Sequence, residues 1–190
     1  MAEALLAITL LVVGASILGT ILMNASGSTA ISKDYLIAQN LATEGVEAVK
    51  NIRDTNWLRM PNDKKCWLAL DPDINCADNT SPTYTSYNDM SYIAGQNNKG
   101  WWSLSKGTES GLDLSNNPDS STNTKFRLYI NGGGKYVHDQ AFTSSPFFRE
   151  VRFTDATELM ATFNVKVQWV EGKKVRTISR DKCTIYNSYE

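Results

Sequence analysis

The stretch Ala4–Met23, ALLAITLLVVGASILGTILM, is an apolar run that contains no charged residue. At about 1.5 Å per helical residue it forms a rod of about 30 Å, long enough to cross the hydrocarbon layer of a bilayer. Glu3 precedes the run, and the next charged residue is Lys33. An unpaired carboxylate on a membrane-embedded helix costs about 2.5 to 3.5 kcal/mol. Glu3 is therefore expected to have a partner, and the nearby chain offers only the terminal amine of Met1.

The rest of the chain is polar and its charges are nearly balanced. The protein has 190 residues and a net charge of −1, which predicts one domain or a small domain with an appendage. Because the charges balance, we expect no general electrostatic attraction of the protein to nucleic acid or anionic lipid. A cleaved signal peptide would carry basic residues before a shorter apolar core, so we interpret the run as part of the mature protein. The predicted organisation is a membrane-dwelling helix followed by an extracytoplasmic head.

A second helical pattern follows the apolar run. Its apolar residues recur at intervals of three and four, which places them on one face of a helix: Ile31, Tyr35, Ala38, Leu41, Gly45, Val49 and Ile52. We predict one long helix to about Arg53, apolar on all sides over 1–30 and amphipathic over 31–53. The amphipathic half is expected to pack its apolar stripe on a globular head, which spans 31–190.

Two glycines interrupt the apolar run, and each weakens a helix by about 1 kcal/mol relative to alanine. Gly19 forms a small-xxx-small pair with Ala15, which would allow a neighbouring helix to approach closely. Alternatively, Gly14 and Gly19 mark a segment that can unwind. Both interpretations imply helical partners, because leucine at these positions would stabilise a lone membrane anchor better than glycine does.

The segment 54–124 is expected to be irregular, since prolines, glycines and many Asn, Ser and Asp residues punctuate it. A connection of this length must be functional or attached to the head. Four tryptophans would attach it by burying their rings: Trp57, Trp67, Trp101 and Trp102. The alternative is that such aromatic residues form a surface site for a ligand.

Strands are predicted over 125–190, where apolar residues alternate with polar ones. The turn at Glu171–Lys173 joins two of these strands as an antiparallel hairpin. Alternation fails between Thr177 and Lys182, where we predict a bulge or a strand end. The predicted fold class is α+β, with a long N-terminal helix packed on an antiparallel sheet.

The chain contains three cysteines, Cys66, Cys76 and Cys183. The first two lie close together in a turn-rich segment, so we predict a disulfide between them and a free thiol at Cys183. The alternative is that all three are reduced and buried.

An acidic stretch between the first two cysteines has the D-x-D-x-N start of a calcium loop, at Asp71, Asp73 and Asn75. The sixth position is Cys76, where such a loop needs glycine, and no glutamate stands at the twelfth. An ordinary acidic loop is therefore favoured over a metal site.

Signatures of catalysis are absent from the sequence. His138 is the only histidine, so a zinc site or a Cys–His pair would lack partners. Phosphate-binding, dinucleotide-binding, nucleophile-elbow and zinc-protease motifs do not occur. We therefore predict a structural protein that is not an enzyme and that uses no cofactor.

Basic residues concentrate in the last predicted hairpin: Lys166, Lys173, Lys174, Arg176, Arg180 and Lys182. They are expected to form a solvated face or to meet acids of a neighbouring subunit. Binding of DNA or another anionic surface is the alternative.

Stretches at both ends of the chain resemble the type IV pilins of bacteria. Glu3–Ala7 and the apolar run look like the start of a mature pilin, and Ile37–Glu47 and Asn51–Leu58 are similar to the later helix of pilin-like proteins. Three further stretches are similar to strands of such proteins: Pro146–Val151, Val165–Trp169 and Thr184–Asn187. The resemblance implies a ladle-like fold and leaves 59–123 uncovered.

The resemblance also implies a mechanism of assembly. In that family a prepilin peptidase removes a short basic leader and methylates the new terminal amine. Subunits wait in the inner membrane until an ATPase-driven machine extrudes them into a filament whose core is a bundle of apolar helices. Glu3 would then pair with the terminal amine of a neighbouring subunit, at Met1 here, and set the register. The glutamate is normally fifth in a mature pilin, whereas it is third here.

The expected function is that of a structural subunit of an extracellular type IV pilus, serving adhesion to a host surface, twitching motility or DNA uptake. A minor pilin or a pseudopilin of type II secretion is the alternative within this class. An extracytoplasmic binding domain on a single-pass membrane anchor is the alternative from another class. In the filament, the residues around Gly14 and Gly19 are expected to lose regular helix.

Overall fold

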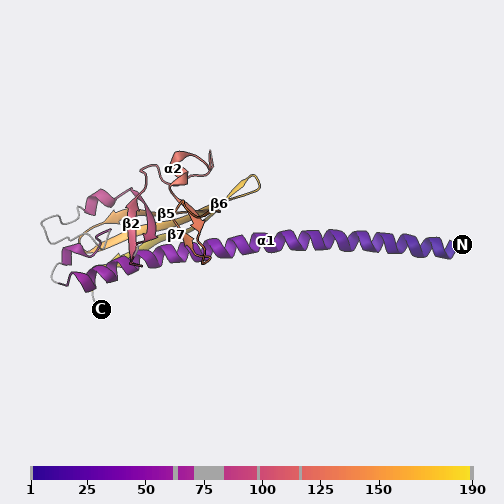
Figure 1. Cartoon of the computed structure of the whole chain (residues 1–190), viewed down its shortest axis with the longest axis horizontal. Helices are drawn as coiled ribbons and strands as arrows, with labels where there is room; N and C mark the ends of the chain where they lie inside the picture. Colours follow the sequence, from indigo (N-terminus) through magenta and orange to yellow (C-terminus); the bar gives the residue numbers. More distant parts are fainter. Residues whose placement is uncertain (1, 62–63, 71–83, 98, 116, 189–190) are drawn as a thin grey trace. The chain divides into compact units, whose positions relative to one another are not determined.

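The structure, a computed structural model, is a helix followed by a sheet (Figure 1). It describes residues 2–61, 64–70, 84–97, 99–115 and 117–188. The chain divides into two compact units, 1–37 and 38–190, and helix α1, Ala2–Arg59, begins in the first and ends in the second. The antiparallel sheet follows α1 in the second unit. The α+β class, with one long N-terminal helix before an antiparallel sheet, is therefore confirmed.

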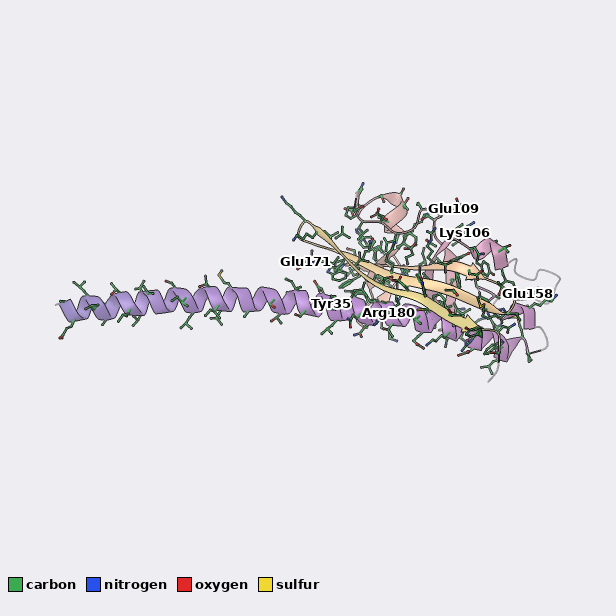
Figure 2. All side chains as sticks on the ribbon, turned by 180° about the vertical axis from the view of Figure 1, so that it is seen from behind. Tyr35, Lys106, Glu109, Glu158, Glu171 and Arg180 are labelled. Atoms are coloured by element: carbon green, nitrogen blue, oxygen red, sulfur yellow. The ribbon has the colours of Figure 1, made fainter. Side chains whose placement is uncertain are left out.

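In the first unit, apolar side chains project around the whole circumference of the helix (Figure 2). The hydroxyl groups among them donate to carbonyls of the preceding turn. Thr9 Oγ1 lies 2.9 Å from the Leu6 carbonyl oxygen, and Ser16 Oγ lies 2.8 Å from that of Val12. Because the helix satisfies these hydroxyls itself, they do not prevent its surface from entering apolar surroundings.

The second unit contains the end of α1, a seven-stranded sheet and three short helical turns. The strands are β1 Ser91–Gln96, β2 Trp102–Lys106, β3 Arg127–Ile130, β4 Tyr136–Val137, β5 Thr143–Ala156, β6 Met160–Glu171 and β7 Lys174–Tyr186. The helical turns are η1 Lys64–Cys66, η2 Tyr84–Tyr87 and α2 Ser121–Thr124. All strand pairs are antiparallel.

The long strand β5 is the centre of the sheet. β6 pairs along one of its edges, while β1 and β3 pair with successive parts of the other. β7 extends the sheet beyond β6, β2 extends it beyond β1, and β4 pairs with β3. Segments far apart in the sequence thus meet at β5.

One face of the sheet forms the main core with the end of α1. Ala48, Val49 and Ile52 are fully buried in one cluster with Phe163 and Val165 of β6. The helix is close to the sheet, since a Cβ on Gly45 would lie 2.6 Å from Cγ1 of Val165. The stripe residues from Ala38 onward therefore pack as predicted.

The opposite face of the sheet is covered by the segment before β3. Leu112, Leu114 and Phe126 are buried against Phe148 of β5. The neighbouring carboxylate of Glu150 is also buried on this face, where Ser91 Oγ donates to it and Lys166 Nζ lies 3.0 Å away. Both faces of β5 are thus buried within the unit.

The first two stripe residues do not join the core. Ile31 is 48% exposed and Tyr35 is 50% exposed, and the first fully buried residue of the stripe is Ala38. The boundary between the two units accordingly lies between Ile37 and Ala38, later than the predicted boundary at 30. Periodicity reports which residues share a face, but not where along the helix that face meets the sheet.

Helix α1 ends at Arg59, six residues later than predicted. Asn56 explains the extension, since it is fully buried and its Nδ2 lies 3.2 Å and 2.9 Å from the carbonyl oxygens of Trp67 and Ala69. The side-chain amide thereby donates to two backbone carbonyl groups of the segment that follows α1. This is a tertiary contact, and local helix propensity does not include it.

The prediction that 54–124 is irregular is wrong in its second half. β1 and β2 form a hairpin there, with Tyr92 opposite Lys106 and Gln96 opposite Trp102. β1 is held by pairing with β5, where Tyr92 lies opposite Val151. Short strands of this kind are stabilised by their partners and not by a strong pattern of their own.

The predicted irregularity near the end of the chain is a bulge in β7. The pairing with β6 shifts between Phe163 and Val165, which lie opposite Cys183 and Arg180. Lys182 has a φ of 54° there, and its backbone N–H donates to Oδ1 of Asn164 at 2.8 Å. The bulge prediction is confirmed.

Candidate functional site

The apolar part of α1 in the first unit is the first candidate site. By length and composition it is the one described helix able to cross a membrane. Its large apolar side chains are strongly exposed, with Leu11 at 72% and Leu22 at 70%. Isolated exposed apolar residues are ordinary, but a continuous apolar surface of this length requires lipid or protein to cover it.

Glu3 lies at the beginning of this apolar surface and its side chain is exposed. Across the described ranges no ion pair reaches its carboxylate, and Met1, its predicted partner, lies outside them. The pairing therefore stays a prediction that concerns a second molecule.

Gly14 and Gly19 have open surroundings in the part of the chain that the structure describes. A Cβ at either position would meet no atom within 4 Å, and α1 is helical through both. Gly45 differs, because a Cβ there collides with Val165. Packing within the described chain therefore does not require glycine at Gly14 or Gly19.

Of the two cysteines in the predicted disulfide, the structure describes only Cys66. Cys66 is fully buried and disulfide-bonded, whereas Cys76 lies outside the described residues. Cys183 is a free thiol, and partial burial raises its pKa. The predicted calcium ligands Asp71, Asp73 and Asn75 also lie outside the described residues. Within the described ranges, no three His, Cys, Asp or Glu side chains are placed to hold a metal ion.

The basic hairpin is partly neutralised within its own chain. Lys166 pairs with Glu150, and Arg176 Nε lies 2.6 Å from Oε2 of Glu171. Arg180 lies within β7 and away from Glu171, the last residue of β6 (Figure 2). The structure thus reduces the predicted basic surface to Lys173, Lys174, Arg180 and Lys182, which are exposed.

The predicted tryptophan anchors have different surroundings. Trp67 is buried and belongs to the main core, and Trp57 Nε1 donates to Oδ1 of Asn187 at 2.9 Å. Trp101 is covered by the guanidinium of Arg59, 4.3 Å from its ring centre. Trp102 is only half-buried and lines a cavity, which corresponds to the alternative of an aromatic ligand site.

That cavity is the second candidate site, and it lies wholly in the second unit. Its volume is about 760 Å³, and its walls come from α1, β1, β2, β4, β5 and the loops that flank β3 and β4. The polar and aromatic residues lining it include Glu44, Trp102, Lys125, Lys135, Tyr136, His138 and Asp139. It also contains Arg149, which sequence analysis did not single out because a lone arginine in a strand carries no motif.

Arg149 is held in place by groups from two directions. It is only 1% exposed, and its Nη2 lies 2.9 Å from the Ala94 carbonyl oxygen. Nη1 lies 3.3 Å from Oε1 of Glu44 and 3.4 Å from the Leu41 carbonyl oxygen. Burial lowers the pKa of the guanidinium and Glu44 opposes this shift, so the arginine remains charged. Its Nε has no partner among the described residues.

His138 lines the same cavity as a neutral imidazole. Its Nδ1 lies 3.1 Å from the carbonyl oxygen of Arg127, so Nδ1 carries the proton and donates it. Burial and the charge of Arg149 lower the pKa of His138 to about 3. Its Nε2 is then a free acceptor, and it has no partner within the part of the chain that the structure describes.

Comparison with known proteins finds no relative of this chain. No protein-family model, curated protein or solved structure matches the chain.

Proposed function

We propose that this chain is a structural subunit of a type IV pilus or a similar filament, assembled through its N-terminal helix. The observation that carries the proposal is the exposed apolar surface of α1 with Glu3 as the one charge in 2–32. Lipid can cover such a surface before assembly, and a bundle of identical helices can cover it afterwards. The ladle-like pilin fold and extracellular location belong to this proposal.

Glu3 would set the register in which each subunit is added to the filament. In an apolar bundle, its carboxylate pairs with the terminal amine of a neighbouring subunit. A subunit added out of register leaves both charges unpaired, which costs several kcal/mol. Gly14 and Gly19 support the proposal, because glycine allows helices to approach or a segment to unwind, and packing within the chain requires neither.

Substitution of Glu3 tests the proposal. Glu3→Ala should leave the chain in the membrane fraction and reduce surface filaments at least about tenfold, since one unpaired buried charge is worth more than 1.4 kcal/mol. Sheared filaments are quantified by immunogold electron microscopy, and insertion is measured by carbonate extraction. Glu158→Ala, which removes an exposed acid of the second unit, is the matched control. Normal filament numbers with Glu3→Ala would contradict the proposal.

A second candidate is a membrane-anchored binding domain, which the cavity of the second unit favours. In that case the chain stays in the membrane and forms no filaments under any condition. If filaments form but contain the chain only as a small fraction of their mass, it is a minor pilin. The mass fraction of the chain in sheared filaments separates these cases.

A further inference from the structure

Strand β7 is an outer edge of the sheet, because β6 is its one partner among the described strands. The stretch from Lys174 to Ser179 lies before the bulge, and its pairing with β6 is regular throughout. This length is that of an ordinary strand in a globular protein. The stretch therefore has one edge that is paired and one that no described strand covers.

The register shows which backbone groups point to the uncovered edge. Glu171 and Lys174 flank a two-residue turn in which Gly172 has a φ of 61°, as a tight hairpin turn requires. The residues that flank such a turn bond to each other, and bonded pairs then alternate along the two strands. Lys174, Arg176 and Ile178 therefore bond to β6. The residues between them point their N–H and C=O groups away from it: Val175, Thr177 and Ser179.

These outward groups lie at the surface. Thr177 and Ser179 are exposed and Val175 is half-buried. Within the described ranges, no turn or loop contributes a backbone hydrogen bond to any of the three. An extended peptide can pair with such a row of alternating donors and acceptors as an added strand. The phosphates of DNA could bond to the N–H groups but not to the carbonyl groups, because phosphates offer acceptors only.

The side chains of this stretch favour an acidic partner. Lys174 and Arg180 are exposed, share one face of β7 and form no ion pair within the described ranges. Arg176 lies between them on that face and is neutralised by Glu171. Glu171 and Arg180 are labelled near the two ends of the stretch in Figure 2. An added strand thus meets two unpaired positive charges on one of its faces.

The same two charges disfavour a second copy of this chain. If two β7 strands paired in antiparallel fashion about Thr177, Lys174 of each copy would lie opposite Arg180 of the other. Like charges directly opposite each other destabilise a strand pair. The partner that fits this edge is therefore a segment of another protein.

We propose that the edge of β7 from Lys174 to Ser179 binds an extended segment of another protein in which acidic residues alternate with β-branched ones. The segment adds to the sheet as a strand. Its acids lie on the face of Lys174 and Arg180, and its β-branched residues lie beside Val175 and Thr177. The inference does not depend on the proposed function, because binding can be measured on the unassembled chain.

A short peptide with the sequence EVETEVE and an N-terminal fluorescein is the probe. The full chain in detergent at pH 7 is titrated into it, and we expect a saturable rise in fluorescence polarisation. The same peptide with N-methyl groups on its inner residues keeps its charges but lacks their N–H donors. Its Kd should be at least about tenfold higher, because several backbone hydrogen bonds are lost. The charge-reversed peptide KVKTKVK should not bind.

Hydrogen exchange, measured by NMR on the ¹⁵N-labelled full chain, locates the bound peptide. Saturation with EVETEVE should slow exchange at the amides of Val175, Thr177 and Ser179 at least about tenfold, since these gain a partner. The amides of Arg176 and Ile178 should keep their exchange rates, because they bond to β6 in both states.

Variants of β7 test the backbone and the charges separately. Thr177→Pro removes an outward N–H and should raise the Kd for EVETEVE about three- to tenfold. Thr177→Ala is its matched control, because both variants lose the 3.2 Å contact from Gln168 Nε2 to Thr177 Oγ1 and only the proline lacks the N–H. Lys174→Ala and Arg180→Ala should each raise the Kd about two- to fivefold. Lys135→Ala, between β3 and β4, should not change it.

Three outcomes would overturn the inference. Absence of saturable binding, or of slowed exchange at the three outward amides, would show that the edge does not accept the peptide. If the N-methylated peptide and a single-stranded oligothymidylate bind as tightly as EVETEVE, the edge is a basic surface only. If the chain associates with itself through these amides and the peptide does not compete, the partner is a second copy.

Discussion

At Gly45 the backbone of α1 lies directly against β6. A Cβ there would be 2.6 Å from Cγ1 of Val165 and 3.4 Å from Cδ of Arg149. Val165 is fully buried and branched at its Cβ, so it cannot rotate away without leaving its preferred rotamer. Glycine is required here because the backbone of α1 lies against the side chain of Val165. The adjacent residue of the helix, Glu44, pairs with Arg149.

Gly45→Ala should therefore destabilise the second unit. We expect a loss of about 1 to 3 kcal/mol in the free energy of unfolding, the usual cost of overpacking a core. Urea unfolding in detergent, followed by tryptophan fluorescence, measures it. Gly27→Ala is the matched control on the same helix, since a Cβ there meets nothing within 4 Å.

A second substitution tests the cause of the loss. In a Val165→Ala background the obstructing methyl is gone, so Gly45→Ala should cost less than in the parent chain. An equal cost in both backgrounds would show that Val165 is not the obstacle.

At the scale of elements, α1 combines two kinds of helix. Its later part is fixed by the sheet, with Ala38, Leu41, Ala42, Ala48, Val49 and Ile52 buried. Its apolar part has no such contacts, and its helical form rests on the backbone and on internally satisfied hydroxyls. Two glycines in that part lower the cost of unwinding by about 1 kcal/mol each.

We expect residues 14–23 to lose regular helix when the filament assembles. Cryo-electron microscopy of sheared filaments measures the backbone of this segment directly. The double substitution Gly14→Ala and Gly19→Ala should lower filament yield and leave urea unfolding of the second unit unchanged, because a Cβ at either glycine meets no atom within 4 Å. Gly27→Ala should leave the yield unchanged. An unbroken helix through 14–23 in the filament contradicts this prediction.

At the scale of the whole molecule, β5 places opposite charges on opposite faces of the sheet. Arg149 points to the face covered by α1 and pairs with Glu44, while Glu150 points to the other face and pairs with Lys166. Each buried charge thus has a partner from a different part of the chain, and removing one partner would leave an uncompensated charge. Folding of the second unit therefore requires both faces to be covered.

The stability of the second unit should depend on pH through His138. Its pKa is lowered to about 3 in the fold from an ordinary value of 6.5. Between these values the unfolded chain binds a proton that the folded chain does not, so stability falls as pH falls. The free energy of unfolding should drop by up to about 1.4 kcal/mol per pH unit below pH 6.5.

Urea unfolding at several pH values between about 5 and 6.5 measures this slope in a range where most carboxylates remain ionised. His138→Phe should flatten the slope, since no other histidine is present. An unchanged slope in that variant would assign the dependence to other groups.

The sequence predicts the secondary structure of some parts of this protein better than that of others. Apolar residues without a charge from Ala4 to Met23 predict a helix, and alternation around Phe163 and Val165 predicts a strand, because each pattern repeats over many residues. The β7 bulge is predicted for the same reason, since the failure of alternation is itself a pattern. The hairpin of β1 and β2 is missed, because it depends on pairing with β5.

The sequence by itself determines the apolar helix, the α+β class and the position of Glu3, because hydrophobicity and periodicity are local properties. Only the tertiary structure decides that Arg149 and His138 meet in one cavity. They belong to a buried strand and a loop, and the cavity exists because α1, β1, β2 and β4 close around them. A site assembled from distant residues has no local pattern, since its contacts arise only when the sheet forms.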